Sequence, residues 1–100
     1  MPSFQAEVPH QLGQQAARER LDSFLENLRN EFKDQVKNLQ GDWDDDKLTF
    51  SFRTYGIDIK GTLHVEEEIV KLDGQIPFTA MMFKGKIEQS IRGELEKVLA

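Results

Sequence analysis

The chain contains no cysteine, and only three of its 100 residues are proline. The lack of cysteine excludes disulfide bonds and thiolate chemistry, and it fits a reducing compartment. No apolar run approaches the length needed to cross a membrane, and the first residues lack the basic flank and apolar core of a signal peptide. We therefore expect a cytoplasmic protein.

Strongly basic segments are also missing. The net charge is −5, and residues 41–77 carry nine acidic and four basic side chains. A protein that binds nucleic acid needs a concentrated positive surface to displace the counterions of the phosphates. Neither end of the chain supplies one, so we do not expect a nucleic-acid partner.

The composition that is present suits one folded unit. Hydrophobic residues make up 38% of the chain and charged residues 31%, which is ordinary for a globular domain. We predict a single α+β domain over residues 1–100, built in two layers. An antiparallel sheet of four or five strands would carry a long N-terminal helix and a C-terminal helix on one face.

Several segments alternate apolar and polar side chains with a period of two, which is typical of strands with one buried face. These segments are 4–8, 48–53, 57–66 and 70–76, and a further short strand is expected to begin at Trp43. The place of the first strand in the sheet is left open.

A two-residue turn at Glu67 and Glu68 would set the register of the last two strands. It brings like residues opposite one another in the pairs Val65–Val70, Leu63–Leu72, Gly61–Gly74 and Ile59–Ile76. A slip by one residue would break every one of these pairs. The pair of glycines predicts a shallow trough in the apolar face, where a helix could approach closely.

Two helices are predicted from apolar side chains spaced three, four or seven residues apart. The first spans residues 12–39, a length of about 40 Å, and Gly41 is expected to end it. The second spans residues 80–99. Since each helix has one apolar stripe and the sheet has one apolar face, we expect both helices to pack on that face.

The sequence shows no pattern for catalysis or metal binding. Asp42, Asp44 and Asp46 occupy the first ligand positions of a calcium loop. However, Lys47 replaces the required glycine, and Arg53 replaces the closing glutamate. We therefore predict a solvated turn, no metal, no cofactor and no enzymatic activity.

The two histidines receive structural interpretations. His64 is predicted to lie on the polar face of a strand, as a surface imidazole. His10 follows Pro9 and precedes the first helix, where a structural role is favoured. A ligand site beside the start of that helix is the alternative left open for His10.

An apolar cluster precedes the second helix. Phe78, Met81 and Met82 point in several directions around one turn, so a single sheet face cannot bury all three. The favoured interpretation places them at the end of the core or in a dimer seam. The alternative is an exposed, adaptable surface that binds a partner and is flanked by Lys84 and Lys86. Both a monomer and a symmetric homodimer are compatible with the sequence.

Specific fragments give the chain a family resemblance. They are Pro9-His10-Gln11-Leu12-Gly13, Lys84-Gly85-Lys86-Ile87-Glu88 and, with less specificity, Gly61-Thr62-Leu63-His64-Val65. With these fragments the chain resembles the polyhydroxyalkanoic acid system proteins, a granule-region family, from Phe4 to Leu99. Glu7-Val8 stands where that family often has basic residues. The resemblance implies association with polyhydroxyalkanoate storage, at granules, and supplies no catalytic residue or cofactor.

The leading hypothesis from the sequence is therefore a non-enzymatic accessory protein of polyhydroxyalkanoate storage. It would act through contacts with granule proteins or with the granule surface. The alternative is a small domain that binds an apolar ligand between the long helix and the concave face of the sheet. An enzyme of unrecognised type is the third hypothesis.

Overall fold

The chain folds in the order strand, helix, four strands, 3-10 helix and helix. The computed structural model describes residues 2–100. Its elements are β1 (Ser3–Pro9), α1 (Gln14–Glu31), β2 (Lys37–Asp44), β3 (Lys47–Thr54), β4 (Ile57–Val65), β5 (Ile69–Gln75), η1 (Phe78–Phe83) and α2 (Lys84–Leu99). Short turns join β2 to β3, β3 to β4 and β4 to β5.

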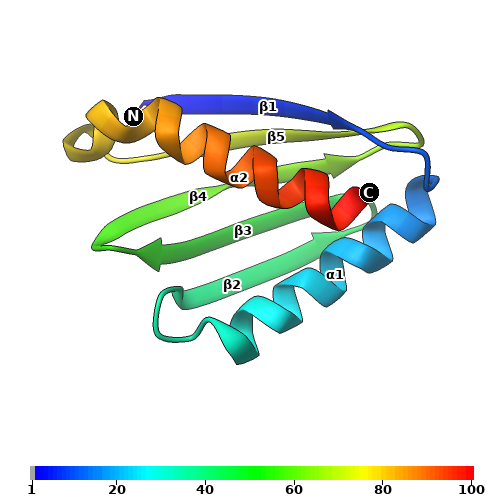
Figure 1. Cartoon of the computed structure of the whole chain (residues 1–100), viewed down its shortest axis with the longest axis horizontal. Coiled ribbons are helices and arrows are strands. Elements are labelled where there is room, and N and C mark those ends of the chain that lie inside the picture. Colours follow the sequence, from blue (N-terminus) through cyan, green and yellow to red (C-terminus); the bar gives the residue numbers. More distant parts are fainter. Residues whose placement is uncertain (1) are drawn as a thin grey trace.

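All five strands form one antiparallel sheet in the order β1-β5-β4-β3-β2 (Figure 1). The predicted α+β class and antiparallel sheet are confirmed, with five strands rather than four. β1 lies at one edge beside β5, which answers the question that the sequence left open. β2 forms the opposite edge.

The register predicted for the last two strands is confirmed over most of its length. The pairs in the structure include Val65–Val70, Leu63–Leu72 and Gly61–Gly74, and the ladder ends at Lys60–Gln75, one residue before the predicted pair Ile59–Ile76. Glu67 and Glu68 form the predicted turn, because the Glu66 N–H donates to the Ile69 carbonyl across it at 2.9 Å.

An aromatic ring, and not a helix, fills the trough expected at the two glycines. Phe4 on β1 pairs with Gly74 and is 2% exposed. A Cβ atom at Gly74 would lie 2.5 Å from Phe4 Cε1, so the ring occupies the space that the missing side chain leaves. The expectation of a helix here is wrong because β1 adds to the sheet beside β5 and brings its own apolar side chain.

The prediction of a first helix over residues 12–39 is wrong, because α1 ends at Glu31 and the chain then enters β2. Within β2, Asn38 has φ of 56°, outside the helical range. Val36 and Leu39 completed the apolar stripe of the predicted helix. In the structure Val36 lies in the connection before β2 and Leu39 lies in β2, and both side chains line the space between the helices and the sheet. Their spacing fits both conformations, and the hydrogen bonds of β2 to β3 decide between them.

Gly41 does not end a helix. It lies in β2 opposite Phe50, where a Cβ atom would stand 3.2 Å from Leu25 Cδ1. The glycine therefore lets α1 lie close to β2. Trp43, expected at the start of a short strand, lies near the end of β2 and pairs with Leu48.

The predicted second helix is present with a different beginning. Residues 78–83 form η1, and the α-helix begins at Lys84 rather than at residue 80. Pro77, with φ of −70° and ψ of 157°, holds an extended conformation just before η1. Among the residues described, no helix is long and apolar enough to cross a membrane.

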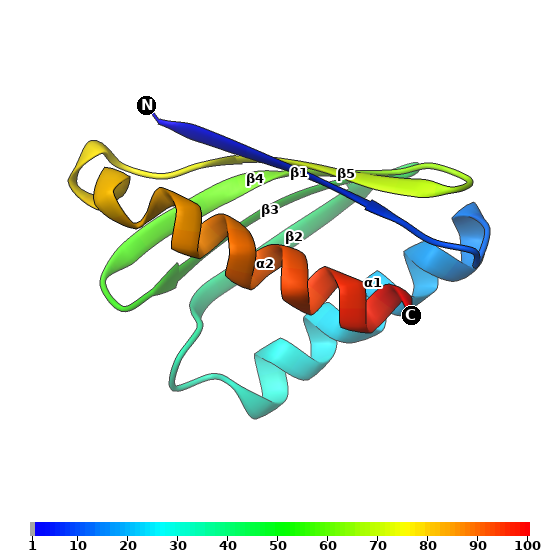
Figure 2. The ribbon, with the colours of Figure 1, turned by 45° about the horizontal axis from the view of Figure 1, so that its top comes forward.

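Both helices lie on the same side of the sheet (Figure 1 and Figure 2). Their buried residues join the inner face of the sheet in one core; these are Ala17, Leu21, Leu95 and Leu99. α2 packs against β1, whereas α1 runs toward the β2 edge. The two helices meet near the end of α2 and diverge toward its beginning, as Figure 2 shows.

Candidate functional site

The first half of α1 is tied to the hairpin turns at one end of the sheet. Gln14 Nε2 donates hydrogen bonds to Asp46 Oδ2 at 2.5 Å and to the Val65 carbonyl at 2.9 Å. Arg18 Nε donates to the Asp45 carbonyl at 3.0 Å. These hydrogen bonds therefore fix the position of the first half of α1 relative to this end of the sheet.

The same half of α1 also holds the β2 edge and the end of α2. The Arg18 guanidinium lies 4.3 Å from the centre of the Trp43 ring, a cation–π contact. Trp43 Nε1 donates to Asp22 Oδ1 at 3.2 Å. Arg20 Nη1 donates to the Ala100 carbonyl at 2.5 Å. The helices are thus joined at one end and separate toward the other.

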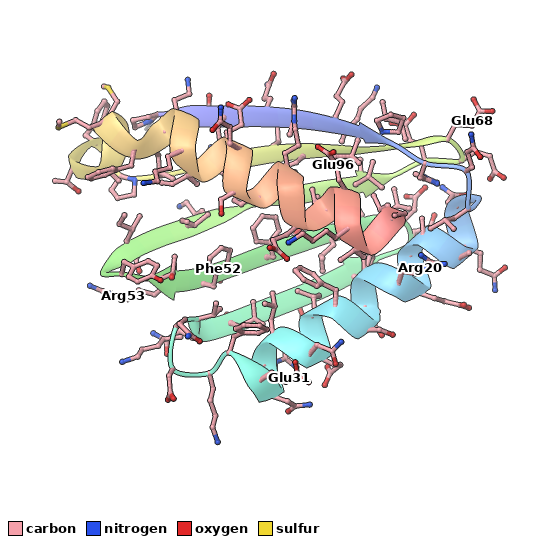
Figure 3. The ribbon with its side chains drawn as sticks, in the orientation of Figure 1. Arg20, Glu31, Phe52, Arg53, Glu68 and Glu96 are labelled. Carbon is pink, nitrogen blue, oxygen red and sulfur yellow. The ribbon has the colours of Figure 1, made fainter. Side chains whose placement is uncertain are left out.

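A cavity of about 560 Å³ opens between the separating helices and the sheet. Figure 3 shows Phe52 of β3 in the space between the two helices. Walls from three parts of the fold include Leu25 and Leu28 of α1, Phe52 and Ile57 of the sheet, and Ile87 and Ile91 of α2. Because these side chains are apolar, the cavity offers a surface that favours an apolar guest.

Polar groups reach the cavity mainly at its rim. They come from Thr54, Tyr55, Lys86, Ser90 and Glu94. Four of these residues are exposed, and Thr54 is half-buried. An apolar interior with a few polar groups at the rim is the usual composition of a small-molecule site, in which the polar groups orient the ligand.

The sequence signals this cavity only indirectly. Phe24, Leu25 and Leu28 belong to the apolar stripe that predicted the first helix, yet the fully buried residues of α1 are Ala17 and Leu21. The apolar stripe of α1 therefore extends beyond the residues that the core buries. The remaining apolar residues of the stripe line the cavity. The cavity lies where the alternative hypothesis placed a ligand, between the first helix and the sheet.

The structural interpretation of His10 is confirmed. Its buried ring accepts a hydrogen bond at Nδ1 from the Leu12 backbone N–H, at 3.2 Å. Since a backbone N–H can only donate, the ring proton lies on Nε2, which donates to the Glu66 carbonyl at 3.1 Å. The His10 N–H also donates to the Glu68 carbonyl at 2.9 Å. The fragment Pro9–Gly13 thus joins the start of α1 to the β4–β5 turn.

Replacing this ring with an apolar ring tests the connection. His10→Phe keeps the buried volume and removes both ring hydrogen bonds, so we expect a loss of about 1–3 kcal/mol in the free energy of unfolding. The measurement is urea denaturation followed by circular dichroism. His64→Phe is the control, because His64 is exposed on β4 as predicted, and it should change stability by less than about 0.5 kcal/mol. Equal losses in the two variants would contradict this role of His10.

The acidic residues 44–46 belong to the β2–β3 hairpin, in which Asp45 has φ of 60°. Within residues 2–100, no three or more histidine, cysteine, aspartate or glutamate side chains are grouped to hold a metal ion. In the neighbouring β4–β5 turn, Glu67 Oε2 accepts a hydrogen bond from the Gln14 N–H at 3.3 Å. This carboxylate therefore lies at the N-terminus of α1, where the helix dipole favours negative charge.

The residues predicted to bind a partner lie in η1 and in the first turn of α2. They are Phe78, Met81, Met82, Lys84 and Lys86, and all five are exposed. The favoured interpretation of the apolar three as filling the end of the core is therefore wrong for this chain. One side of η1 faces the core, and Ala80 occupies it. A dimer seam stays a prediction, and Lys86 also lines the cavity.

Comparisons with known proteins place the chain in a family context. The family described as "Putative polyhydroxyalkanoic acid system protein" matches residues 5–99, nearly the whole chain. The crystal structure of TTHA0849 from Thermus thermophilus is similar with a TM-score of 0.44 and 14% identity, over 98% of this chain and 92% of that chain. A likeness at this level supports no inference. No curated protein matches the chain.

Proposed function

Because the chain belongs to the family of polyhydroxyalkanoic acid system proteins, we propose that it serves polyhydroxyalkanoate storage by holding one apolar chain in its cavity. The observation that carries the proposal is the volume of about 560 Å³, which falls within the range of about 300–1,000 Å³ typical of small-molecule sites. The proposed role is binding without reaction, in the cytoplasm and without a cofactor.

The chemistry of the lining indicates the class of ligand. Hydroxyalkanoic acids, the units of such a polymer, join an apolar alkyl group to carboxyl and hydroxyl oxygens. The alkyl group would lie against Phe52, Ile57 and Ile87, and the oxygens would lie near Lys86 and Ser90 at the rim. Removal of the alkyl group from water supplies the driving force, at about 25 cal/mol for each Å² of apolar surface buried.

Action through contacts with granule proteins or the granule surface, without a ligand, is the second mechanism. The exposure of Met81 and Met82 supports it, because large apolar side chains in solvent are typical of interaction surfaces. The two mechanisms differ in one measurable respect. Only the first requires a saturable site for a small apolar molecule.

Titration with N-phenylnaphthylamine, whose fluorescence rises in apolar surroundings, tests the cavity. We expect saturable binding of one probe per chain, and displacement of the probe by decanoate and by a hydroxydecanoate. Leu28→Trp fills the cavity from α1 and should weaken probe binding at least about tenfold, which corresponds to about 1.4 kcal/mol.

Asn30→Trp is the matched control, because Asn30 lies two residues further along α1 and is exposed. It should bind the probe as the unchanged protein does, and circular dichroism should show both tryptophan variants to be folded. Equal affinity of Leu28→Trp and the unchanged protein would contradict the proposal. A complete lack of saturable binding in the unchanged protein would favour action through contacts alone.

A further inference from the structure

Most of the large apolar side chains that the structure exposes belong to elements at one end of the molecule. Among residues 2–100 they are Phe32, Tyr55, Phe78, Met81, Met82 and Phe83. They belong to three connections, from α1 to β2, from β3 to β4 and from β5 to α2. The antiparallel order of the strands brings the β3–β4 turn and η1 to the same end, and the α1–β2 connection runs toward this end from the last turn of α1, as Figure 1 shows. We name this end, residues 32–37, 54–57 and 77–86, the mouth end.

The cavity opens at the mouth end. Tyr55 and Phe83 belong both to the exposed apolar group and to the lining of the cavity. Val36, in the α1–β2 connection, lines the cavity as well. The apolar surface outside the cavity is therefore continuous with the apolar surface inside it.

The two ends of the molecule carry opposite charge. The mouth end contains Lys33 of the α1–β2 connection, Lys37 at the start of β2, and Lys84 and Lys86 at the start of α2, with Asp34 as its one acidic residue. The turns at the other end, residues 44–47 and 66–68, contain six carboxylates and one lysine. Figure 3 shows Arg53 near the mouth end and Glu68 at the far end. Arg53 is paired with Asp58 at 3.7 Å, so it adds little to this contrast.

We infer that the mouth end docks onto an anionic lipid layer, with the side chains of η1 entering the layer and the four lysines facing its headgroups. Basic residues beside exposed apolar side chains are the pattern of proteins that lie at such a boundary. A lipid layer also needs no complementary shape, which suits three separate connections that protrude together. Docking goes beyond the proposed function, because it does not depend on whether the cavity holds a ligand.

The conformation of Tyr55 agrees with this assignment. It is 87% exposed and has φ of 52°, in the tight turn that it forms with Gly56. Bulky residues rarely adopt positive φ, and asparagine, aspartate or glycine is usual at this turn position. Tyrosine is enriched at the boundary between lipid and water, because its ring is apolar and its hydroxyl is polar.

The net charge of −5 does not oppose docking in this orientation. The molecule is 37 Å along its longest axis, and the strands run along that axis (Figure 1). Salt at physiological concentration screens charges over about 8 Å. The carboxylates of the far turns therefore lie several screening lengths from a layer at the mouth end, and the nearby lysines determine the local attraction.

Sedimentation of the full chain with lipid vesicles tests the inference. We expect the protein to sediment with vesicles of phosphatidylglycerol and phosphatidylcholine, and to remain in solution with phosphatidylcholine alone. Because the attraction is electrostatic, raising the salt concentration to about 1 M should release most of the bound protein. Leu28→Trp should bind the vesicles normally, so failure of docking and failure of ligand binding are separate outcomes.

Two pairs of variants locate the docking surface. Met81→Ser/Met82→Ser should lower vesicle binding about tenfold while leaving the midpoint of thermal unfolding nearly unchanged, since both side chains are exposed. Lys33→Gln/Lys84→Gln should also lower binding. Lys47→Gln/Lys71→Gln changes the net charge equally and lies outside the mouth end, so it should bind as the unchanged protein does.

Several results would overturn the inference. One is equal binding to the two kinds of vesicle, or no binding to either. Another is an equal loss in the two lysine pairs, which would show a response to net charge alone. A third is a dimer in sedimentation velocity that dissociates in Met81→Ser/Met82→Ser, because the apolar group would then be a seam between two copies.

Discussion

Val65→Glu should lower the free energy of unfolding by about 4 kcal/mol or more. Val65 is 0% exposed, belongs to the hydrophobic core and pairs with Val70 at the last position of β4. The substitution removes apolar packing and places a carboxyl group where water cannot reach it. Because a domain of this kind is stable by only about 5–15 kcal/mol, the loss is a large fraction of the total. Urea denaturation monitored by circular dichroism measures it.

His64→Glu, one residue earlier on β4, should be neutral or slightly stabilising. His64 is exposed and lies between Lys47 on β3 and Lys71 on β5, so a carboxylate there faces two lysines across the strands. The two variants introduce the same side chain on opposite faces of one strand. Similar denaturation midpoints for both would show that the face of β4 is wrongly assigned.

Gly74→Ala should cost about 2–3 kcal/mol although it adds one methyl group. The added Cβ would lie 2.5 Å from Phe4 Cε1, and Phe4 is 2% exposed, so the ring cannot move aside without disturbing the core. Such overpacking typically costs about 1–3 kcal/mol. Gly93→Ala is the matched control, because a Cβ in α2 at that position meets no atom within 4 Å. It should stabilise the protein by up to about 1 kcal/mol, since alanine favours a helix.

A double variant checks that the cost at Gly74 comes from the ring. In Gly74→Ala/Phe4→Leu the smaller side chain leaves room for the new methyl group, so the combined loss should be less than the sum of the two single losses. Simple additivity of the three free energies of unfolding would mean that Phe4 is not the residue that excludes a side chain at Gly74.

The strands were predictable because their information is local. In β4 and β5 the apolar residues recur at every second position, and a two-residue turn at Glu67 and Glu68 permits one register that pairs Val65 with Val70. A one-residue slip would expose all of the apolar residues of one strand. The alternation and the turn together therefore specify the register of the two strands. The structural role of His10 was predictable for the same reason, because it lies between a proline and a helix.

The end of α1 was not predictable in this way. Val36 and Leu39 fit the helical spacing, and they also serve the interior from β2 and the connection before it. Local propensity does not separate the two conformations. Pairing with β3 decides for the strand conformation, because the edge of β3 offers backbone hydrogen bonds to β2. Those hydrogen bonds join residues that are not neighbours in the sequence.

The sequence by itself determined the α+β class, the strands of the β3–β4–β5 meander, the buried face of each and the family. The spacing of apolar residues within a helix or strand shows which of its faces is apolar, and this spacing can be read from the residues of that element alone. Only the tertiary structure decided that the helices separate to open a cavity, and that the exposed apolar side chains and lysines share its mouth. The helices are joined at the opposite end by hydrogen bonds such as Arg20 to Ala100, which link residues 80 positions apart. No local pattern records the distance between two helices.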